Sequence, residues 1–294
     1  MGKREYIGGI TTLVLIAILL VLWGIAIHRN IREIKQATVN GVSINYLVKG
    51  KANGKPVLLI HGNGGSHKDL SVIIDQLAQN GYLVWAPDSR GQGDNPPLTE
   101  YHYADMAEDM HCFVEQVIVP YYHYTAASGT PFYSKITRYA SSVISGNRLA
   151  TYMPGPVKPA VFGWSDGGII ALMTEVKYPG TWSAIVTSGA NIFPDCGIWN
   201  LEEERIHPAD TSALYRMMLY EPDMTAEDMQ TIQCPSLIVA GEHDAIPLEH
   251  THLIGDNIPN GEIMIVPGAD HGSHIMHSPK MGRIILEYFK QINY

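Results

Sequence analysis

A serine between glycines, in the segment Gly163-Trp164-Ser165-Asp166-Gly167-Gly168, has the residue types and spacing of a presented nucleophile. The apolar run 159–162 before it is typical of a buried strand, and the run 169–173 opens a helical pattern. A G-x-S-x-G sequence between a strand and a helix predicts a sharp turn that lifts the Ser165 hydroxyl above a sheet edge. Because a serine hydroxyl is a weak nucleophile, the prediction also requires a base, an acid and oxyanion donors.

Candidates for the acid and the base follow two later apolar runs. Asp244 comes shortly after the run 236–240, and His271 comes shortly after the run 262–266. Carboxyl ends of parallel strands meet at one edge of a sheet, where ligands bind. We therefore expect Asp244 to orient His271, and His271 to act as the base. Asp195, after the preceding strand, is the competing acid.

The histidines at 271, 274 and 277 have the spacing H-x-x-H-x-x-H, which could also hold a metal ion. No cysteine or carboxylate ligand motif accompanies them, and His271 already has a role as the base. The sequence therefore predicts no metal and no cofactor.

Oxyanion donors are expected in the glycine-rich loop after the apolar run 57–60. The loop reads His61-Gly62-Asn63-Gly64-Gly65, and its small residues allow a backbone N–H to point at a developing charge. The predicted donors are the N–H groups of Asn63 and of Asp166. A phosphate-binding loop is the rival interpretation, but the segment lacks Gly-Lys-Ser/Thr and the G-x-G-x-x-G spacing.

The order Ser165, Asp244, His271, together with the Trp-Ser-Asp-Gly-Gly turn and the segment 234–244, resembles α/β-hydrolases. The resemblance is to lipases and esterases, haloperoxidase-like proteins and the valacyclovir-hydrolase-like subgroup, and it covers about residues 37–292. It implies an α/β fold with a mostly parallel, twisted sheet of about eight strands, helices on both faces and a short cap. Relatives with an aspartate or cysteine nucleophile are disfavoured by Ser165.

Alternating patterns give the elements that must position these residues. Asn40-Gly41 between two apolar stretches predicts a hairpin, and a charged linker is expected over 29–36. Strands are expected at 56–61, 82–87, 159–163, 182–188, 236–241 and 262–266, and helices near 67–79, 101–118, 167–178, 248–257 and 277–291. Such alternation is typical of a parallel sheet covered on both faces.

Two segments interrupt this alternation. Residues 191–226 separate two strands and are expected to form a cap over the site. Residues 120–157 form an insertion, and no Asp or Glu occurs between Gln116 and Ser165. The insertion is either an ordinary lid or a surface that faces anionic lipid through Lys135 and Arg138.

The segment 7–27 is uncharged and strongly apolar, with Lys3 and Arg4 before it and Arg29 after it. Its length matches the roughly 20 residues that span a bilayer. We expect residues 1–35 to be a single-pass anchor with its linker, and residues 36–294 to be the catalytic domain. A buried core helix and a cleaved signal peptide are the alternatives. The flanking charges nearly balance across the span, and the short leading tail favours an extracytoplasmic catalytic domain.

Together these features predict a membrane-anchored serine hydrolase that cleaves carboxylic esters, or amides, through an acyl-enzyme on Ser165. The alternatives are carbon–carbon bond hydrolysis, perhydrolysis, or a hydrolase fold that binds a ligand or partner without turnover. The formal net charge of −9 disfavours nucleic acid as a partner. The expected partners are a small-molecule ester and the lipid bilayer, and the sequence leaves the oligomeric state open.

Overall fold

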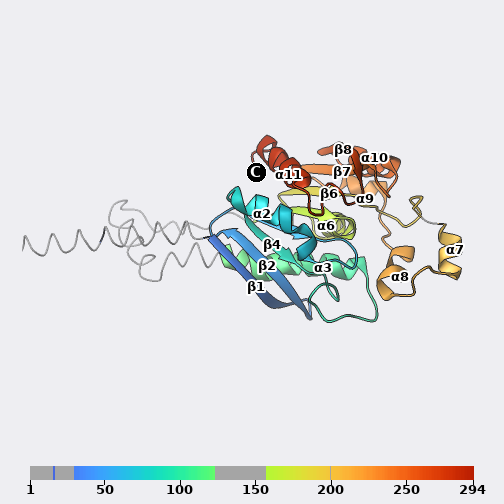
Figure 1. Cartoon of the computed structure of the whole chain (residues 1–294), viewed down its shortest axis with the longest axis horizontal. Coiled ribbons are helices and arrows are strands. Elements are labelled where there is room, and N and C mark those ends of the chain that lie inside the picture. Colours follow the sequence, from blue (N-terminus) through green and yellow to red (C-terminus); the bar gives the residue numbers. More distant parts are fainter. Residues whose placement is uncertain (1–15, 17–29, 123–156, 199) are drawn as a thin grey trace, which may run out of the picture.

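An eight-stranded, mostly parallel sheet forms the centre of the structure (Figure 1). The computed structural model describes residue 16 and residues 30–122, 157–198 and 200–294. The strand order is β1-β2-β4-β3-β5-β6-β7-β8. Strand β2 runs antiparallel to both β1 and β4, and the other neighbouring strands are parallel. The predicted α/β class, with about eight strands and an antiparallel hairpin at one edge, is confirmed.

The described elements follow the expected alternation closely. The strands are β1 Asn30–Val39, β2 Val42–Lys51, β3 Pro56–Ile60, β4 Leu83–Pro87, β5 Ala160–Trp164, β6 Ala184–Ser188, β7 Ser236–His243 and β8 Gly261–Asp270. The main helices are α2 Ser71–Gln79, α3 Tyr103–Phe113, α6 Asp166–Lys177, α7 Leu201–Ile206, α8 Ala213–Tyr220, α9 Ala226–Gln230, α10 Leu248–Asn257 and α11 Lys280–Gln291. A short 3₁₀ turn, η1 His67–Leu70, precedes α2, and a π-helical segment, η2 Val114–Ile118, continues α3.

Alternate residues of β3 enter two separate apolar layers. Val57 and Leu59 pack with buried residues of α2 and α11 on one face of the sheet. Leu58 and Ile60 pack with buried residues of α3 and α6 on the other face. All four side chains are fully buried, because helices cover both faces. This explains why the strand is apolar throughout instead of alternating with polar residues.

The hairpin between β1 and β2 turns at Asn40 and Gly41, whose φ angles are 47° and 77°. Two consecutive positive φ values suit the twist of a two-residue hairpin, which explains the choice of Asn-Gly. The charged linker expected over 29–36 is wrong from Asn30 onward, because β1 pairs with β2 from Asn30↔Lys51 to Val39↔Val42. Charged and polar side chains on an edge strand are compatible with backbone pairing and discourage association with other sheets.

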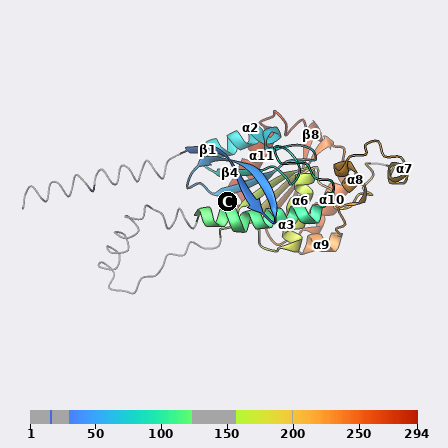
Figure 2. The same ribbon diagram turned by 90° about the horizontal axis from the view of Figure 1, so that it is seen from below.

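The structure describes most of the segment predicted to form a cap, but almost none of the segment predicted to form an anchor. Helices α7 and α8 lie within 191–226, at the end of the molecule opposite the start of β1 (Figures 1 and 2). The insertion lies outside the described residues from 123 to 156, and the expected span 7–27 lies outside them except for Ile16. Within the part of the chain that the structure describes, no helix is both long and apolar enough to cross a membrane.

Candidate active site

Ser165 occupies the turn between β5 and α6 in a backbone conformation that few residues other than glycine adopt. Its φ and ψ angles are 55° and −120°. The Ser165 N–H donates to the Ser188 carbonyl at 2.8 Å, and the Ser165 carbonyl accepts from Gly168 N–H at 2.8 Å. The strained turn is thus held by β6 on one side and by the first turn of α6 on the other, as a nucleophile elbow requires.

Two glycines of the turn are required by close backbone approach. A Cβ atom on Gly163 would lie 2.1 Å from the Gly167 carbonyl oxygen, and one on Gly167 would lie 2.1 Å from the Ile60 carbonyl oxygen. Neither position has room for a side chain. The G-x-S-x-G pattern therefore reflects the packing of β5, α6 and β3 around Ser165.

The glycine-rich loop after β3 contacts the nucleophile. A Cβ atom on Gly62 would lie 3.3 Å from the Ser165 Cβ. The loop is fixed by a hydrogen bond from Gly65 N–H to the Gly62 carbonyl and by one from Gly64 N–H to Gln92 Oε1. Among the described residues, neither the Asn63 N–H nor the Asp166 N–H donates a hydrogen bond. Both groups are available to an oxyanion beside Ser165.

Asp244 and His271 are brought together at the carboxyl ends of β7 and β8. His271 Nδ1 lies 2.6 Å from Asp244 Oδ1. The same carboxylate accepts from Gly241 N–H and Ile246 N–H, each at 3.1 Å. Burial opposes ionisation of Asp244, but the hydrogen bond from His271 and the two N–H groups hold its pKa below the usual value. An ionised Asp244 fixes the proton of His271 on Nδ1 and leaves Nε2 free to accept a proton.

Trp164 and Gly189 also fix the position of His271. Trp164 Nε1 donates to the His271 carbonyl at 2.9 Å, so the residue before the nucleophile holds the backbone of the base. Gly189 lies against the ring, since a Cβ there would be 2.7 Å from His271 Cε1. No hydrogen bond joins the Ser165 hydroxyl to His271 in the described structure. Catalytic hydrogen bonds of free enzymes are often long and tighten when substrate binds.

The side chain of Asp166 joins the turn to two other elements. It accepts from Asn63 Nδ2 and from the Tyr103 hydroxyl, both at 2.8 Å. Burial raises the pKa of Asp166 to about 6, and these two hydrogen bonds oppose the rise only in part. The sequence analysis assigned a role only to the Asp166 backbone N–H. In the structure, the Asp166 side chain also links the glycine-rich loop after β3 and helix α3 to the turn.

Two buried histidines hold the loop after β3 against the loop after β4. His61 Nε2 accepts from Ser89 N–H, so its Nδ1 carries the proton that is donated to the Gly62 carbonyl at 2.7 Å. Burial lowers the pKa of His61, which favours this neutral form. Asp88 accepts from the N–H and the Nδ1 of His67, both at 2.8 Å. Arg90 Nε and Nη2 donate to Asp109 on α3, so Asp88 and Arg90 both anchor the loop after β4.

The other candidate residues lie apart from the Asp244–His271 pair. Asp195 is exposed in the segment after β6 and makes no contact with His271. His274 lies before the last helix, since α11 begins at Lys280. His274 is buried in the turn after β8, 2.8 Å from Ser188 Oγ, and His277 is exposed. Among the described residues, no group of three or more His, Cys, Asp or Glu side chains could hold a metal ion.

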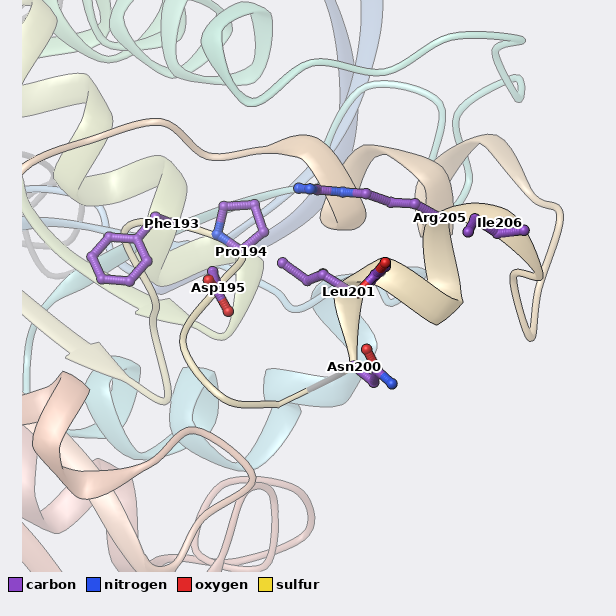
Figure 3. Close-up of a pocket in the computed structure, with 8 residues that line it drawn as sticks. Phe193, Pro194, Asp195, Asn200, Leu201, Arg205 and Ile206 are labelled. Atoms are coloured by element: carbon purple, nitrogen blue, oxygen red, sulfur yellow. The ribbon is translucent and has the colours of Figure 1, made fainter.

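A hollow of about 660 Å³ lies between the segment after β6 and helix α7. Its wall combines Phe193, Pro194, Leu201 and Ile206 with the charged residues Asp195, Glu202 and Arg205 (Figure 3). Neither Ser165 nor His271 lines it. The hollow therefore belongs to the cap, and we assign it no part in the chemistry.

Comparison with known proteins agrees with this geometry. The profile of the α/β-hydrolase fold matches residues 55–128. Human serine hydrolase BPHL is 22% identical over 286 residues, covering 87% of this chain and 86% of its own length. The non-heme chloroperoxidase CPO-A1 of Kitasatospora aureofaciens is 23% identical, covering 86% of this chain and 98% of its own. A thermophilic esterase from Thermogutta terrifontis superposes with a TM-score of 0.63 at 17% identity, covering 89% of this chain and all of that one.

The described structure has the α/β-hydrolase fold, which agrees with the matching profile and with the superposed esterase. Its relatives include proteins named as serine hydrolase and chloroperoxidase, so the chain is similar to hydrolases along most of its length.

Proposed function

We propose that this chain is a membrane-anchored serine hydrolase that cleaves carboxylic esters through an acyl-enzyme on Ser165. The observation that carries the proposal is the Asp244–His271 hydrogen bond at the sheet edge where the strained Ser165 turn lies. An ionised carboxylate, an oriented imidazole and a hydroxyl on a sharp turn are the parts of a serine nucleophile system. Amides contain the same reacting carbonyl and are the second substrate class.

In the proposed reaction, Ser165 Oγ attacks the ester carbonyl carbon while His271 Nε2 takes the hydroxyl proton. The N–H groups of Asn63 and Asp166 stabilise the negative oxygen of the tetrahedral intermediate. The protonated His271 then gives its proton to the leaving alcohol oxygen as the carbon–oxygen bond breaks. Water attacks the acyl-enzyme with His271 again as base, and the acid is released with Ser165 restored.

The proposed anchor is the segment 7–27. It carries no charged side chain over a length that suits a bilayer, and positive residues flank it. We also propose an extracytoplasmic catalytic domain, on the basis of the short tail that precedes the apolar run. The full-length protein should stay with membranes in high salt, since apolar transfer is not screened by ions, and added protease should reach the catalytic domain in intact cells.

A fluorophosphonate probe and a series of p-nitrophenyl esters of graded chain length test the chemistry. The parent protein should label and turn over, whereas Ser165→Ala and His271→Ala should lose activity by several orders of magnitude. Asp244→Asn should reduce turnover far more than Asp195→Asn, its matched control outside the site. A folded parent protein that neither labels nor hydrolyses any ester would instead be a binding protein.

The similarity to a chloroperoxidase favours perhydrolysis as a second candidate activity of the same residues. Hydrogen peroxide would replace water in the attack on the acyl-enzyme and release a peracid. With an added short-chain acid, peroxide and bromide, the released peracid would oxidise bromide to hypobromite, and bromination of monochlorodimedone by the parent, but not by Ser165→Ala, would support this activity. Carbon–carbon bond hydrolysis remains the alternative if ester turnover is absent but Ser165 still labels.

A further inference from the structure

Residues 30, 122 and 157, which border the segments 17–29 and 123–156, all lie at the sheet edge opposite Ser165. Asn30 starts β1 and pairs with Lys51 at the end of β2. The Tyr122 hydroxyl donates to the Gly54 carbonyl in the loop between β2 and β3. Residue 157 resumes the chain just before β5. Figure 2 shows the start of β1 and the end of the α3–η2 helix at one end of the molecule, away from α7 and α8.

We call this edge the amino edge because the parallel strands begin there. Tyrosine and lysine side chains are its main polar groups. Its tyrosines are joined to the strand ends: the Tyr121 hydroxyl donates to the Ala52 carbonyl, and the Tyr294 hydroxyl accepts from Ala160 N–H. The cations near it are the half-buried Lys51 and the exposed Lys55, Lys158, Lys177 and Lys290, and the exposed acidic residues near it are Glu115, Asp256 and Glu262. Lysine and tyrosine side chains are the types that suit a membrane–water interface.

The opposite edge, which holds Ser165 and His271, is acidic. The loops and helices that follow the strand ends there expose Asp94, Glu100, Asp195, Glu202, Glu203, Glu242 and Asp270. The exposed cations among them are Lys68, Arg205 and Arg216. An anionic lipid surface therefore attracts the amino edge and repels the active-site edge.

We propose that the amino edge faces the bilayer, so that the active site opens away from the membrane and takes water-borne esters instead of bilayer lipids. This inference rests on the proposed anchor at 7–27. Only His28 and Arg29 separate that segment from Asn30, so Asn30 lies within about 11 Å of its end. The five residues of β5 then carry Ser165 roughly 16 Å further across the sheet.

The test uses the full-length protein in vesicles of phosphatidylcholine, with and without phosphatidylserine, that contain a spin-labelled headgroup lipid. Cys112, Cys196 and Cys234 are first replaced by alanine, and fluorophosphonate labelling of Ser165 reports correct folding. A fluorophore is then attached through Asn53→Cys at the amino edge or Glu203→Cys on α7, both exposed positions. The probe at 53 should be quenched severalfold more strongly than the probe at 203.

Reversing the lysine charges distinguishes electrostatic attraction of the amino edge to lipid from tethering of the protein by its proposed anchor. Lys55→Glu with Lys158→Glu should weaken quenching at 53 in vesicles with phosphatidylserine and leave it unchanged without that lipid. The matched control, Lys68→Glu with Arg216→Glu, makes the same charge change at the active-site edge and should not weaken it. The same vesicles should release no fatty acid from their own lipids.

The outcomes distinguish this inference from the proposed function. Protein that floats with vesicles but shows equal quenching at 53 and 203, or stronger quenching at 203, overturns the orientation and leaves the anchor in place. Protein that does not float overturns both the anchor and the orientation. Labelling of Ser165 by the fluorophosphonate tests the chemistry independently of either result.

Discussion

At the scale of single residues, Ser165 is the clearest case of strain used to present a functional group. Its φ of 55° and ψ of −120° suit glycine far better than serine, and such a conformation is unfavourable by about 1–3 kcal/mol. Ser165→Gly should therefore be more stable than Ser165→Ala by about 1 kcal/mol, although both are inactive, because only glycine relieves the strain. Urea unfolding of both variants checks this, and an alanine variant as stable as the glycine variant would contradict it.

Gly189 offers a second test at this scale. It has no side chain, but a side chain introduced there would press on the His271 ring. A Cβ in Gly189→Ala would press on His271 Cε1 and Nδ1, at 2.7 and 2.8 Å. Turnover should fall by about 10²-fold, the effect typical of a displacement near 1 Å. Gly268→Ala is the matched control. The φ of 66° at Gly268 is similar to the φ at Gly189, so alanine is strained equally at both positions, but no atom lies within 4 Å of the Cβ added at Gly268. Equal activity loss in both variants would make backbone strain the cause.

Asp166 should make stability depend on pH in an unusual direction. The pKa of this carboxyl is near its usual value of 3.8 in an unfolded chain, whereas burial raises the pKa to about 6 in the folded protein. Between these values the folded state binds more protons, so stability falls as pH rises, by up to about 3 kcal/mol. Urea unfolding from about pH 4 to 7 should show this fall in the parent and in the exposed control Asp195→Asn, but not in Asp166→Asn. A parallel fall in all three proteins would assign it elsewhere.

The sequence predicted the residues to which the proposed reaction assigns roles, but not the residues that hold them in place. Ser165, Asp244 and His271 follow strand ends, and that position is visible as an apolar run followed by a polar residue. Gly189 and Tyr103 reach the site only through tertiary packing, and nothing in their local sequence distinguishes them. His274 likewise packs beside Ser188 in the turn before α11, a contact that the H-x-x-H spacing does not reveal.

At the scale of elements, the end of the cap is joined to the start of α3. Glu221 follows α8, and its two carboxylate oxygens accept from His102 Nδ1 at 2.5 Å and from Tyr103 N–H at 2.9 Å. The hydroxyl of the same Tyr103 donates to Asp166. The cap therefore connects through one tyrosine to the residue after the nucleophile.

Glu221→Gln should weaken this junction in a pH-dependent way. The hydrogen bond to Glu221, with help from Glu100, raises the pKa of His102 above its usual value. The stabilisation is complete below the unfolded pKa of about 6.5 and is lost as pH rises through the higher folded value. Thermal unfolding should show a larger effect of Glu221→Gln at about pH 6 than at about pH 9, modest because the His102 side chain is 45% exposed. An effect of equal size at both values would mean that His102 is not involved.

At the scale of the whole molecule, the sheet begins earlier in the chain than the charge pattern indicated. Removal of residues 1–29 should give a water-soluble, active protein, because β1 starts at Asn30. Removal of residues 1–35 also deletes the pairs from Asn30↔Lys51 to Lys35↔Tyr46 and leaves β2 as an open edge. The shorter protein should unfold several degrees lower and associate, which calorimetry and light scattering would detect. Identical behaviour of the two proteins would show that this part of β1 adds no stability.

The order of helices and strands could be predicted because each element has its own local pattern. The edge of the sheet at which the insertion 120–157 is attached could not be predicted from composition. Its lack of acidic residues is visible in the sequence, but its attachment at the amino edge follows from the direction of α3 and β5. A helix that returns from the active-site edge must end at the other edge, so any segment added there starts away from Ser165.

The acidic active-site edge also bears on what happens after catalysis. Each proposed turnover releases a carboxylate anion at Ser165, on the same edge of the molecule as the exposed carboxylates Asp195, Glu202, Glu203 and Asp270. Like charges repel over a distance of about a Debye length, near 8 Å in physiological salt. The acid product is therefore driven outward while the neutral alcohol diffuses freely, and rebinding of the acid to the free enzyme is disfavoured. The surface charge thus weakens inhibition by the acid product and leaves the overall equilibrium of the reaction unchanged.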